Sequence, residues 1–333
     1  MKNYKAHFLF LFLITFSFCF YSCSKNEKKG DDHKLTIAIM DWPGFYPADI
    51  AFDLGIFKKS GLDITIKRYA NNLEIRKNMM SQERSDIAFG TFFDVILDNT
   101  LDANLRAIYI VDMSENADII VAGNSINNIQ ELKGKTISYE GDLTFSHFFV
   151  HEILKQNKID KNTFLKNILA KDVPNEIDKG TIQAGHSWAP YTNHFLAKKG
   201  NNILAYAKDF PGIITDTMFS TPQSINEKSE SIKIFIEVFN KVQLELKENP
   251  DKYMSYLTKK YQLSPLEIRE MINSIKITTL KDNKFMFSEF NELPSCKKHF
   301  ELTIDFIKSL RSLKENFSYK NSVDNKFVNW INN

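Results

Sequence analysis

Cysteine is scarce in this chain, with three among 333 residues, at positions 19, 23 and 296. So few thiols support neither a disulfide framework nor a zinc site. The chain also lacks a phosphate-binding loop, a His-Glu-x-x-His motif and the serine, histidine and aspartate order of known hydrolases. We therefore expect a protein that is not an enzyme and that uses no metal and no cofactor.

An excess of charge of one sign is missing as well. The whole chain has a formal net charge of +2. Removal of residues 1–22 would take away two lysines and leave 41 basic residues against 41 acidic ones. Lysine and arginine do not cluster on a motif either. The sequence therefore gives nucleic-acid binding no electrostatic support.

Long apolar runs are confined to the N-terminus. Residues 8–21 are rich in phenylalanine and leucine, but this run is too short for a membrane-spanning helix, which needs ~20 residues. Lys2 and Lys5 precede it, and this pattern predicts a signal peptide over residues 1–22. Ser22 and Cys23 resemble the lipobox of bacterial lipoproteins, which implies lipidation of Cys23. In the alternative interpretation, the leader is an ordinary secretory signal and Cys23 is incidental.

The residues after Cys23 are polar and charged as far as Lys34. This composition predicts a solvated tether over residues 23–34. Together with the leader, it predicts a protein of the cell envelope that faces the periplasm or the exterior. The lipid would be its only attachment to the membrane.

The remainder of the chain alternates predicted strands and helices, which indicates parallel βαβ units and the α/β class. The predicted strands are 35–40, 62–67, 87–89, 105–111, 118–121, 135–139, 164–169, 183–188 and 202–207. The predicted helices are 47–57, 73–81, 92–97 and 146–156, and the part from residue 227 onward is mostly amphipathic helix. Aromatic and methionine stripes in that last part are interpreted as core.

Several motifs occur in order along this pattern. They are Asp-Trp-Pro-Gly-Phe-Tyr-Pro at 41–47, Asp-Ile-Ala-Phe-Gly at 86–90, Ala-Asp-Ile-Ile-Val at 117–121, Leu-Lys-Gly-Lys at 132–135 and Ser-Trp-Ala-Pro-Tyr at 187–191. Over residues 35–250 the chain resembles the solute-binding proteins of ABC importers in the nitrate, sulfonate and taurine group, which also includes binders of thiamine-pyrimidine and riboflavin precursors. Leu-Lys-Gly-Lys occurs in many two-lobed binding proteins, whereas the tryptophan-containing motifs are more specific to this group.

The resemblance implies a two-lobed type II periplasmic-binding-protein fold. Each lobe would be a mainly parallel sheet flanked by helices, and two hinge crossings would join the lobes. The first lobe would comprise 35–121 and 218–333, and the second 122–217, with crossings near 121–124 and 217–222. Ligand would then lie outside the carboxyl ends of the strands.

Candidate ligand-binding residues of the first lobe follow its predicted strands. Trp42 and Tyr46 can wall a ligand, or pack beneath a loop. Gly90 lets backbone approach a ligand, and Thr91 offers a hydroxyl and an N–H at a helix start, or simply caps that helix. Asp216 lies near the return crossing, where it either contacts the ligand or holds the hinge.

Candidate residues of the second lobe begin with Thr144, Ser146 and His147 at the start of a helix. Unpaired N–H groups and the helix dipole favour an anion there. The alternative is a helix cap at Ser146 with His147 turned away. Trp188 is expected to line the ligand site, and the nearby His186 has no second metal ligand at useful spacing.

Acidic residues occur in four of the loops expected near the ligand: Asp41, Asp94, Asp142 and Asp216. Unpaired carboxylates would repel nitrate or sulfate, whereas they suit an amine or an aminopyrimidine ring. We therefore expect a small organic ligand, either taurine-like or another sulfonate, or pyrimidine-like.

These observations predict a monomeric solute-binding lipoprotein that delivers its ligand to an ABC permease and its ATPase. One alternative is a ligand-sensing lipoprotein of the same fold. Another is a thiamine-pyrimidine biosynthetic enzyme, against which the missing cysteine-rich stretch and the export signal count.

Overall fold

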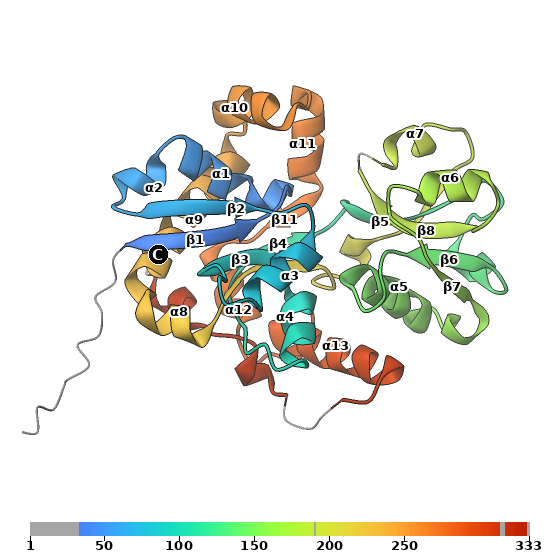
Figure 1. Cartoon of the computed structure of the whole chain (residues 1–333). Helices are drawn as coiled ribbons and strands as arrows, with labels where there is room; N and C mark the ends of the chain where they lie inside the picture. Colours follow the sequence, from blue (N-terminus) through green and yellow to red (C-terminus); the bar gives the residue numbers. More distant parts are fainter. Residues whose placement is uncertain (1–32, 190, 314–316, 332–333) are drawn as a thin grey trace, which may run out of the picture. The chain divides into compact units, whose positions relative to one another are not determined.

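The computed structural model describes residues 33–189, 191–313 and 317–331 (Figure 1). The predicted signal peptide, the Cys23 lipidation site and the tether up to residue 32 lie outside the described residues. Within those residues, no helix has the length and apolar character needed to cross a membrane.

The first sheet contains six strands in the order β11-β4-β10-β3-β1-β2. Strands β1 (Lys34–Ile39), β2 (Asp63–Arg68) and β3 (Ile87–Thr91) pair in parallel. Strands β10 (Thr215–Ser220) and β11 (Ile275–Ile277) run antiparallel to their neighbour β4 (Arg106–Ser114). Because β10 is also antiparallel to β3, strands β1, β3 and β4 end at the same edge.

The helices that accompany this sheet come from two separate parts of the chain. The N-terminal ones are α1 (Tyr46–Asp53), α2 (Ile56–Lys59), α3 (Asn72–Met79) and α4 (Phe92–Asn99), preceded by the short η1 (Pro43–Phe45). The later ones are α8 (Pro222–Glu227), α9 (Ser229–Glu248), α10 (Asp251–Tyr261), α11 (Pro265–Asn273), α12 (Leu280–Met286) and α14 (Lys326–Trp330), with η5 (Tyr319–Asn321).

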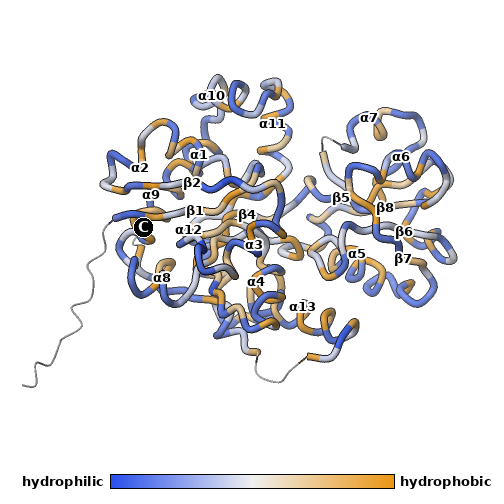
Figure 2. The backbone as a smooth tube through the Cα atoms, in the orientation of Figure 1, coloured by the Kyte–Doolittle hydropathy of each residue, from blue (hydrophilic) through white to orange (hydrophobic). Residues whose placement is uncertain are grey.

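Aromatic packing fixes α9 against the first sheet. Its buried Phe235 stacks on Phe57 with ring centroids 4.7 Å apart, and Phe239 lies 5.6 Å from Phe89 of β3. Each buried phenylalanine contributes roughly 1.5–3 kcal/mol to stability. Figure 2 shows hydrophobic residues concentrated in buried elements such as α4, and hydrophilic residues along the turns. The aromatic stripe expected to be core is therefore core.

The second sheet has five strands in the order β7-β6-β8-β5-β9. They are β5 (Asp118–Ala122), β6 (Thr136–Tyr139), β7 (Phe164–Asn167), β8 (Ala184–Trp188) and β9 (Asn202–Tyr206). Strand β6 pairs in parallel with β7 and β8, whereas β5 is antiparallel to β8 and β9. The accompanying helices are α5 (Phe145–Gln156), α6 (Val173–Asp178) and α7 (Asn193–Leu196), with the short η2 (Ile129–Leu132), η3 (Asp160–Asn162) and η4 (Ala207–Asp209).

The connections between the sheets lie earlier in the chain than expected. Residues 118–122 already pair within the second sheet, and 215–220 already pair within the first. The chain therefore crosses at 115–117 and 207–214, several residues before the predicted 121–124 and 217–222. Backbone N–H groups of Glu115, Asn116 and Ala117 all donate to the carbonyl of Ser274, at 3.1, 2.8 and 3.1 Å. This carbonyl holds the first crossing against the end of α11.

The α/β fold class with two lobes is confirmed, but each sheet is mixed where a mainly parallel one was expected. The sequence missed β10 and β11, and it did not resolve the helices after α11. One of these, α13 (Cys296–Leu310), contacts α4 and also α5. Its Phe306 and Ile307 belong to the core that surrounds the second sheet. The C-terminal part is thus not confined to the first lobe, to which it was assigned.

Candidate functional site

A row of polar side chains crosses the first sheet where its strands end. Thr91 is the last residue of β3, Asp112 lies near the end of β4, and Asp216 lies near the start of β10. In the register of the sheet, Asp216 stands opposite Thr91 on one side and opposite Asp112 on the other. All three side chains are buried. Antiparallel pairing of β10 thus brings residues from three separated segments together.

The Trp-Pro-Gly segment after β1 packs against the Asp112 carboxylate. Trp42 donates from Nε1 to Oδ1 of Asp112 at 3.4 Å. A Cβ atom added to Gly44 would lie 1.7 Å from Oδ2 of Asp112, far inside contact distance. Glycine is therefore required at position 44 because the carboxylate occupies the space of a side chain. Oδ2 itself has no hydrogen-bond partner among the described residues.

The two facing carboxyl groups influence each other's ionisation. Burial raises the pKa of Asp112 to about 7. Burial also raises the pKa of Asp216 well above its ordinary value, and the negative charge of Asp112 adds to this effect. Two buried like charges in contact cannot both ionise readily, so the pair retains a proton near neutral pH.

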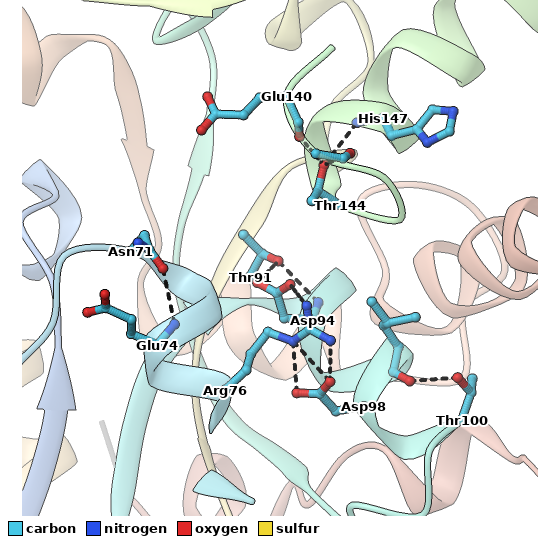
Figure 3. A network of polar contacts seen from close by, with 12 residues as sticks. Asn71, Glu74, Arg76, Thr91, Asp94, Asp98, Thr100, Glu140, Thr144 and His147 are labelled. Carbon is cyan, nitrogen blue, oxygen red and sulfur yellow. Dashed lines mark hydrogen bonds and ion pairs between the residues drawn. The ribbon is translucent and has the colours of Figure 1, made fainter. Parts of the chain in front are cut away.

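The neighbouring Asp94 and Asp98 on α4 share one arginine, Arg76. Nε of Arg76 donates to both carboxylate oxygens of Asp98, at 2.9 and 3.0 Å, and its Nη1 lies 3.8 Å from Asp94 (Figure 3). The hydroxyl of Thr91 donates to Asp94 at 2.8 Å and accepts the Asp94 backbone N–H at 3.1 Å. Arg76 is thus engaged by two carboxylates, and Thr91 caps α4 as the alternative interpretation had it.

A second polar chain lies at the strand ends of the other lobe. Nε2 of His186 is 2.9 Å from Oδ1 of Asp118, and its Nδ1 is 2.6 Å from Oγ of Ser146. Ser146 also accepts the backbone N–H of Glu140 at 2.8 Å. A proton on Nε2 satisfies Asp118 and leaves Nδ1 to accept from the serine hydroxyl. Asp118 is paired across the strands with Trp188, whose ring lies 5.4 Å from that of His186.

Four other predicted site residues have contacts that are structural. Thr144 caps α5, accepting the His147 N–H at 3.3 Å, while the His147 ring turns away (Figure 3) and stacks on Tyr139 at 3.9 Å. Burial lowers the pKa of His147 to about 4. Tyr46 is buried against Tyr261 at 4.2 Å and directs its hydroxyl to Met271. Gly90 has the ring of Phe219 where its own side chain would be, at 3.2 Å.

Two of the four acidic loop residues already have partners on the surface side. Asp41 pairs with Arg68 at 2.8 Å and is exposed. Asp142 accepts a hydrogen bond from the Tyr139 hydroxyl at 2.5 Å.

The residue that sequence analysis missed is Asp112. A signal was present, since it is an acidic residue in an otherwise apolar stretch, but nothing local placed it opposite Asp216.

A cavity of about 280 Å³ lies apart from this row. It is lined by Asn116, Ala117, Ile119, Ala189, Thr192, Asn193, Leu196, Ile203, Leu263, Glu267, Glu270, Met271 and Ser274. None of the predicted ligand-binding residues belongs to it. Its walls are mainly apolar and include the first crossing. We place the candidate site at the strand ends instead, because buried polar groups converge there.

Among the described residues, no cluster of three or more histidine, cysteine or acidic side chains could hold a metal ion.

Solved structures with the same fold come from several sources. The aliphatic sulphonate-binding protein SsuA of Escherichia coli is 13% identical, with a TM-score of 0.68 over 84% of this chain and 88% of that one. A sulfonate-binding periplasmic protein of Methylobacillus flagellatus is 13% identical, with a TM-score of 0.71 over 90% and 94%. The alkanesulfonate-binding SsuA of Xanthomonas axonopodis, bound to MOPS, is 12% identical, with a TM-score of 0.64 over 86% and 96%. These likenesses establish the two-lobed binding-protein fold.

Comparison with curated protein sequences finds no match. A family model does match, over residues 42–253, which is more than half of the chain. The matched region begins at Trp42 and includes the polar row of the first lobe and the Asp118–His186–Ser146 chain of the second. The chain therefore belongs to the NMT1/THI5-like family.

Proposed function

We propose that this protein is the solute-binding component of an ABC importer and binds a small organic ligand outside the cytoplasm. The observation that carries the proposal is the buried polar row Thr91–Asp216–Asp112, which lies beside Trp42 at the strand ends of a binding-protein fold. Solved structures of this fold include sulfonate-binding proteins of import systems, and membership in the NMT1/THI5-like family is consistent with the same role.

The ligand would contact both lobes in this proposal. The first lobe would offer Trp42, Thr91 and Asp216. The second would offer Trp188, which adjoins the buried chain from Asp118 to Ser146 at the strand ends. Because the chain passes between the two sheets at 115–117 and 207–214, rotation at these crossings would close the lobes on the ligand. Closure is favoured only by the contacts that the ligand adds across both lobes.

Delivery would follow recognition of the closed form by a membrane permease and its ATPase. Lipidation at Cys23 would hold the protein close to that permease and so raise its effective concentration there. The protein would act as a monomer and would bind its ligand without transforming it. Ser146, His186 and Asp118 do not contradict this, because all three are buried and Ser146 already accepts a backbone N–H.

Thermal unfolding in the presence of candidate ligands tests the proposal. The panel contains alkanesulfonates, taurine, nitrate, aminopyrimidines and flavins, each with the mature protein lacking residues 1–22. A ligand at 100 times its dissociation constant stabilises the folded state by about 2.7 kcal/mol. We expect one class to raise the melting temperature, and isothermal calorimetry then gives its affinity. If no class binds, and a reconstituted importer takes up none of them, the proposed function is wrong.

A further inference from the structure

Seven acidic side chains are buried among the described residues: Asp49, Asp94, Asp98, Asp112, Asp118, Glu152 and Asp216. Five of them have a basic partner. Arg68 and Lys260 pair with Asp49, Arg76 pairs with Asp94 and Asp98, His186 pairs with Asp118, and Lys155 pairs with Glu152. Asp112 and Asp216 have none. The two buried acids without a cation are thus the two that face each other across β4 and β10.

An unpaired buried carboxylate is costly, because burial in a medium of low dielectric removes its hydration without replacing it. The pair reduces this cost by sharing a proton between its two carboxyl groups, and this still leaves one negative charge without a basic partner. Oδ2 of Asp112, a fully buried side chain, meets no hydrogen-bond partner among the described residues. The sheet therefore carries an uncompensated negative charge at the strand ends of the fold, beside Trp42, whose Nε1 donates to Oδ1 of Asp112.

We infer that Asp112 and Asp216 together bind a positively charged nitrogen of the ligand, which supplies the missing counter-ion. This inference rests on the proposed function and names its ligand class, a cation or a zwitterion with an ammonium or amidinium group. Trp42 can contribute a cation–π contact to the same nitrogen.

An anion alone fits this row poorly. The guanidinium of Arg76 is already held in a two-point contact by Asp98 and lies beside Asp94, which accepts the Thr91 hydroxyl. Asp94 and Asp118 add negative charge around Asp216. A ligand with an anionic group would have to place it away from this row, for example toward the second lobe, and present its cationic end to Asp112 and Asp216.

Matched pairs of probes test the inference by calorimetry at pH 7.5. Taurine is compared with isethionate, which has a hydroxyl in place of the ammonium group, and 4-amino-2-methylpyrimidine with 2-methylpyrimidine. Ethanolamine serves as a cation without an acidic end. We expect the amino-bearing member of at least one pair to bind at least tenfold more tightly than its partner. We also expect Asp112→Asn and Asp216→Asn each to weaken that binding by at least tenfold, while Asp178→Asn, an exposed residue paired with Lys198, leaves it unchanged.

A measurement without ligand tests the missing counter-ion directly. Asp112→Asn removes an unpaired buried charge, so we expect the melting temperature at pH 8 to rise by about 2 °C or more. Asp98→Asn removes a paired charge and leaves Arg76 without its strongest partner, so its melting temperature is expected to fall. A fall of similar size in both variants would show that Asp112 has a stabilising partner and would overturn the inference.

The outcomes separate the inference from the proposed function. If isethionate or 2-methylpyrimidine binds as tightly as its amino-bearing partner, and its binding is insensitive to Asp112→Asn, the solute-binding role stands and the inference fails. If no cationic or zwitterionic probe binds, the inference also fails. Failure of every ligand class, together with no uptake by the importer, removes the proposed function itself.

Discussion

At the scale of single residues, the absence of a side chain at Gly44 leaves room for the carboxylate of Asp112. Gly44 follows a strand that is distant in sequence from Asp112, yet the Asp112 carboxylate fills the space that a Cβ at position 44 would need. The requirement comes from this close approach and not from backbone dihedral angles. The glycine of the Trp-Pro-Gly motif is therefore explained by the Asp112 carboxylate that packs against it.

Substitution of Gly44 by alanine should weaken ligand binding specifically, beyond any loss of overall stability. The new Cβ forces Asp112 or the η1 loop to move, which typically costs about 1–3 kcal/mol. We expect a loss of ligand affinity of at least tenfold, measured by calorimetry once a ligand is known. The control is Gly134→Ala, at a turn with φ of 74° and open space around it, which should reduce stability but leave affinity unchanged. Equal affinities for Gly44→Ala and wild type would contradict this role.

Arg76 illustrates the opposite case of a buried charge that is fully compensated. Replacement by glutamine leaves Asp94 and Asp98 buried without a cation, and breaking such a pair costs about 3–5 kcal/mol. We expect a clearly lower urea midpoint for Arg76→Gln. Lys198→Gln removes an exposed ion pair with Asp178 and should change the midpoint little. The interpretation is wrong if the two variants have the same stability.

At the scale of elements, helix α13 links the two lobes through histidine-rich packing. His299 lies between Phe92 of α4, at 5.3 Å, and Phe148 of α5, at 5.7 Å, and neither of its ring nitrogens has a hydrogen-bond partner among the described residues. Phe306 on the same helix lies 5.0 Å from the ring of His147. Burial lowers the pKa of both His299 and His147 to about 4.

These histidines predict a loss of stability in acid. In the unfolded chain these histidines bind protons near pH 6.5, whereas in the folded protein they are protonated only near pH 4. The stabilising contribution of each histidine is therefore complete above pH 6.5 and is lost as the pH falls from 6.5 to 4, by up to about 3 kcal/mol per histidine for a shift of this size. Urea unfolding of wild type and His299→Leu between pH 4 and 7 measures it. The variant should show a shallower decline, and an unchanged slope would exclude His299 as a cause.

Asp112 should act in the opposite direction over the same range. Its pKa is raised to about 7, so the folded state binds a proton that the unfolded state releases above its ordinary carboxyl pKa. This contribution is present at low pH and is lost as the pH rises through 7. We expect the stability of Asp112→Asn to fall more steeply than that of wild type as the pH is lowered from 8 to 5. A parallel pair of curves would show that Asp112 is not the titrating group.

At the scale of the whole molecule, the two crossings at 115–117 and 207–214 are tied to the first lobe and to each other. The Ser274 carbonyl accepts three N–H groups of the first crossing, and the backbone N–H of Lys208 donates to the carbonyl of Glu115 at 2.8 Å. Both connections are thus fixed by backbone hydrogen bonds, which any residue except proline can donate whatever its side chain. This explains why no residue type in the sequence marks their exact position.

The membrane anchor also belongs to this scale. Cys23→Ala should yield protein that no longer fractionates with membranes and no longer incorporates labelled fatty acid, while Cys19→Ala should behave as wild type. Fractionation of cells, with detection of the label, checks this. Continued labelling of Cys23→Ala would place the acylation site elsewhere or show that the leader is an ordinary secretory signal.

The sequence predicted the local elements well because their signals are local. Apolar alternation located β1, β2 and β6, and amphipathic spacing located α5 and α9. It missed β10 because Thr-Asp-Thr is a polar start for a strand that becomes buried only between β3 and β4. Among the candidate site residues, Trp42 and Asp216 come together in the structure, whereas Tyr46 and His147 are engaged in packing.

By itself, the sequence determined the α/β class and located the strands from β1 to β9, because these signals depend on residues close together in the chain. Only the tertiary structure decided which charges are compensated. Asp112 and Asp216 are separated by a whole lobe in sequence, and antiparallel pairing of β10 with β4 places them face to face. Whether a carboxylate has a cation beside it depends on such long-range pairing, and this pairing leaves these two without one.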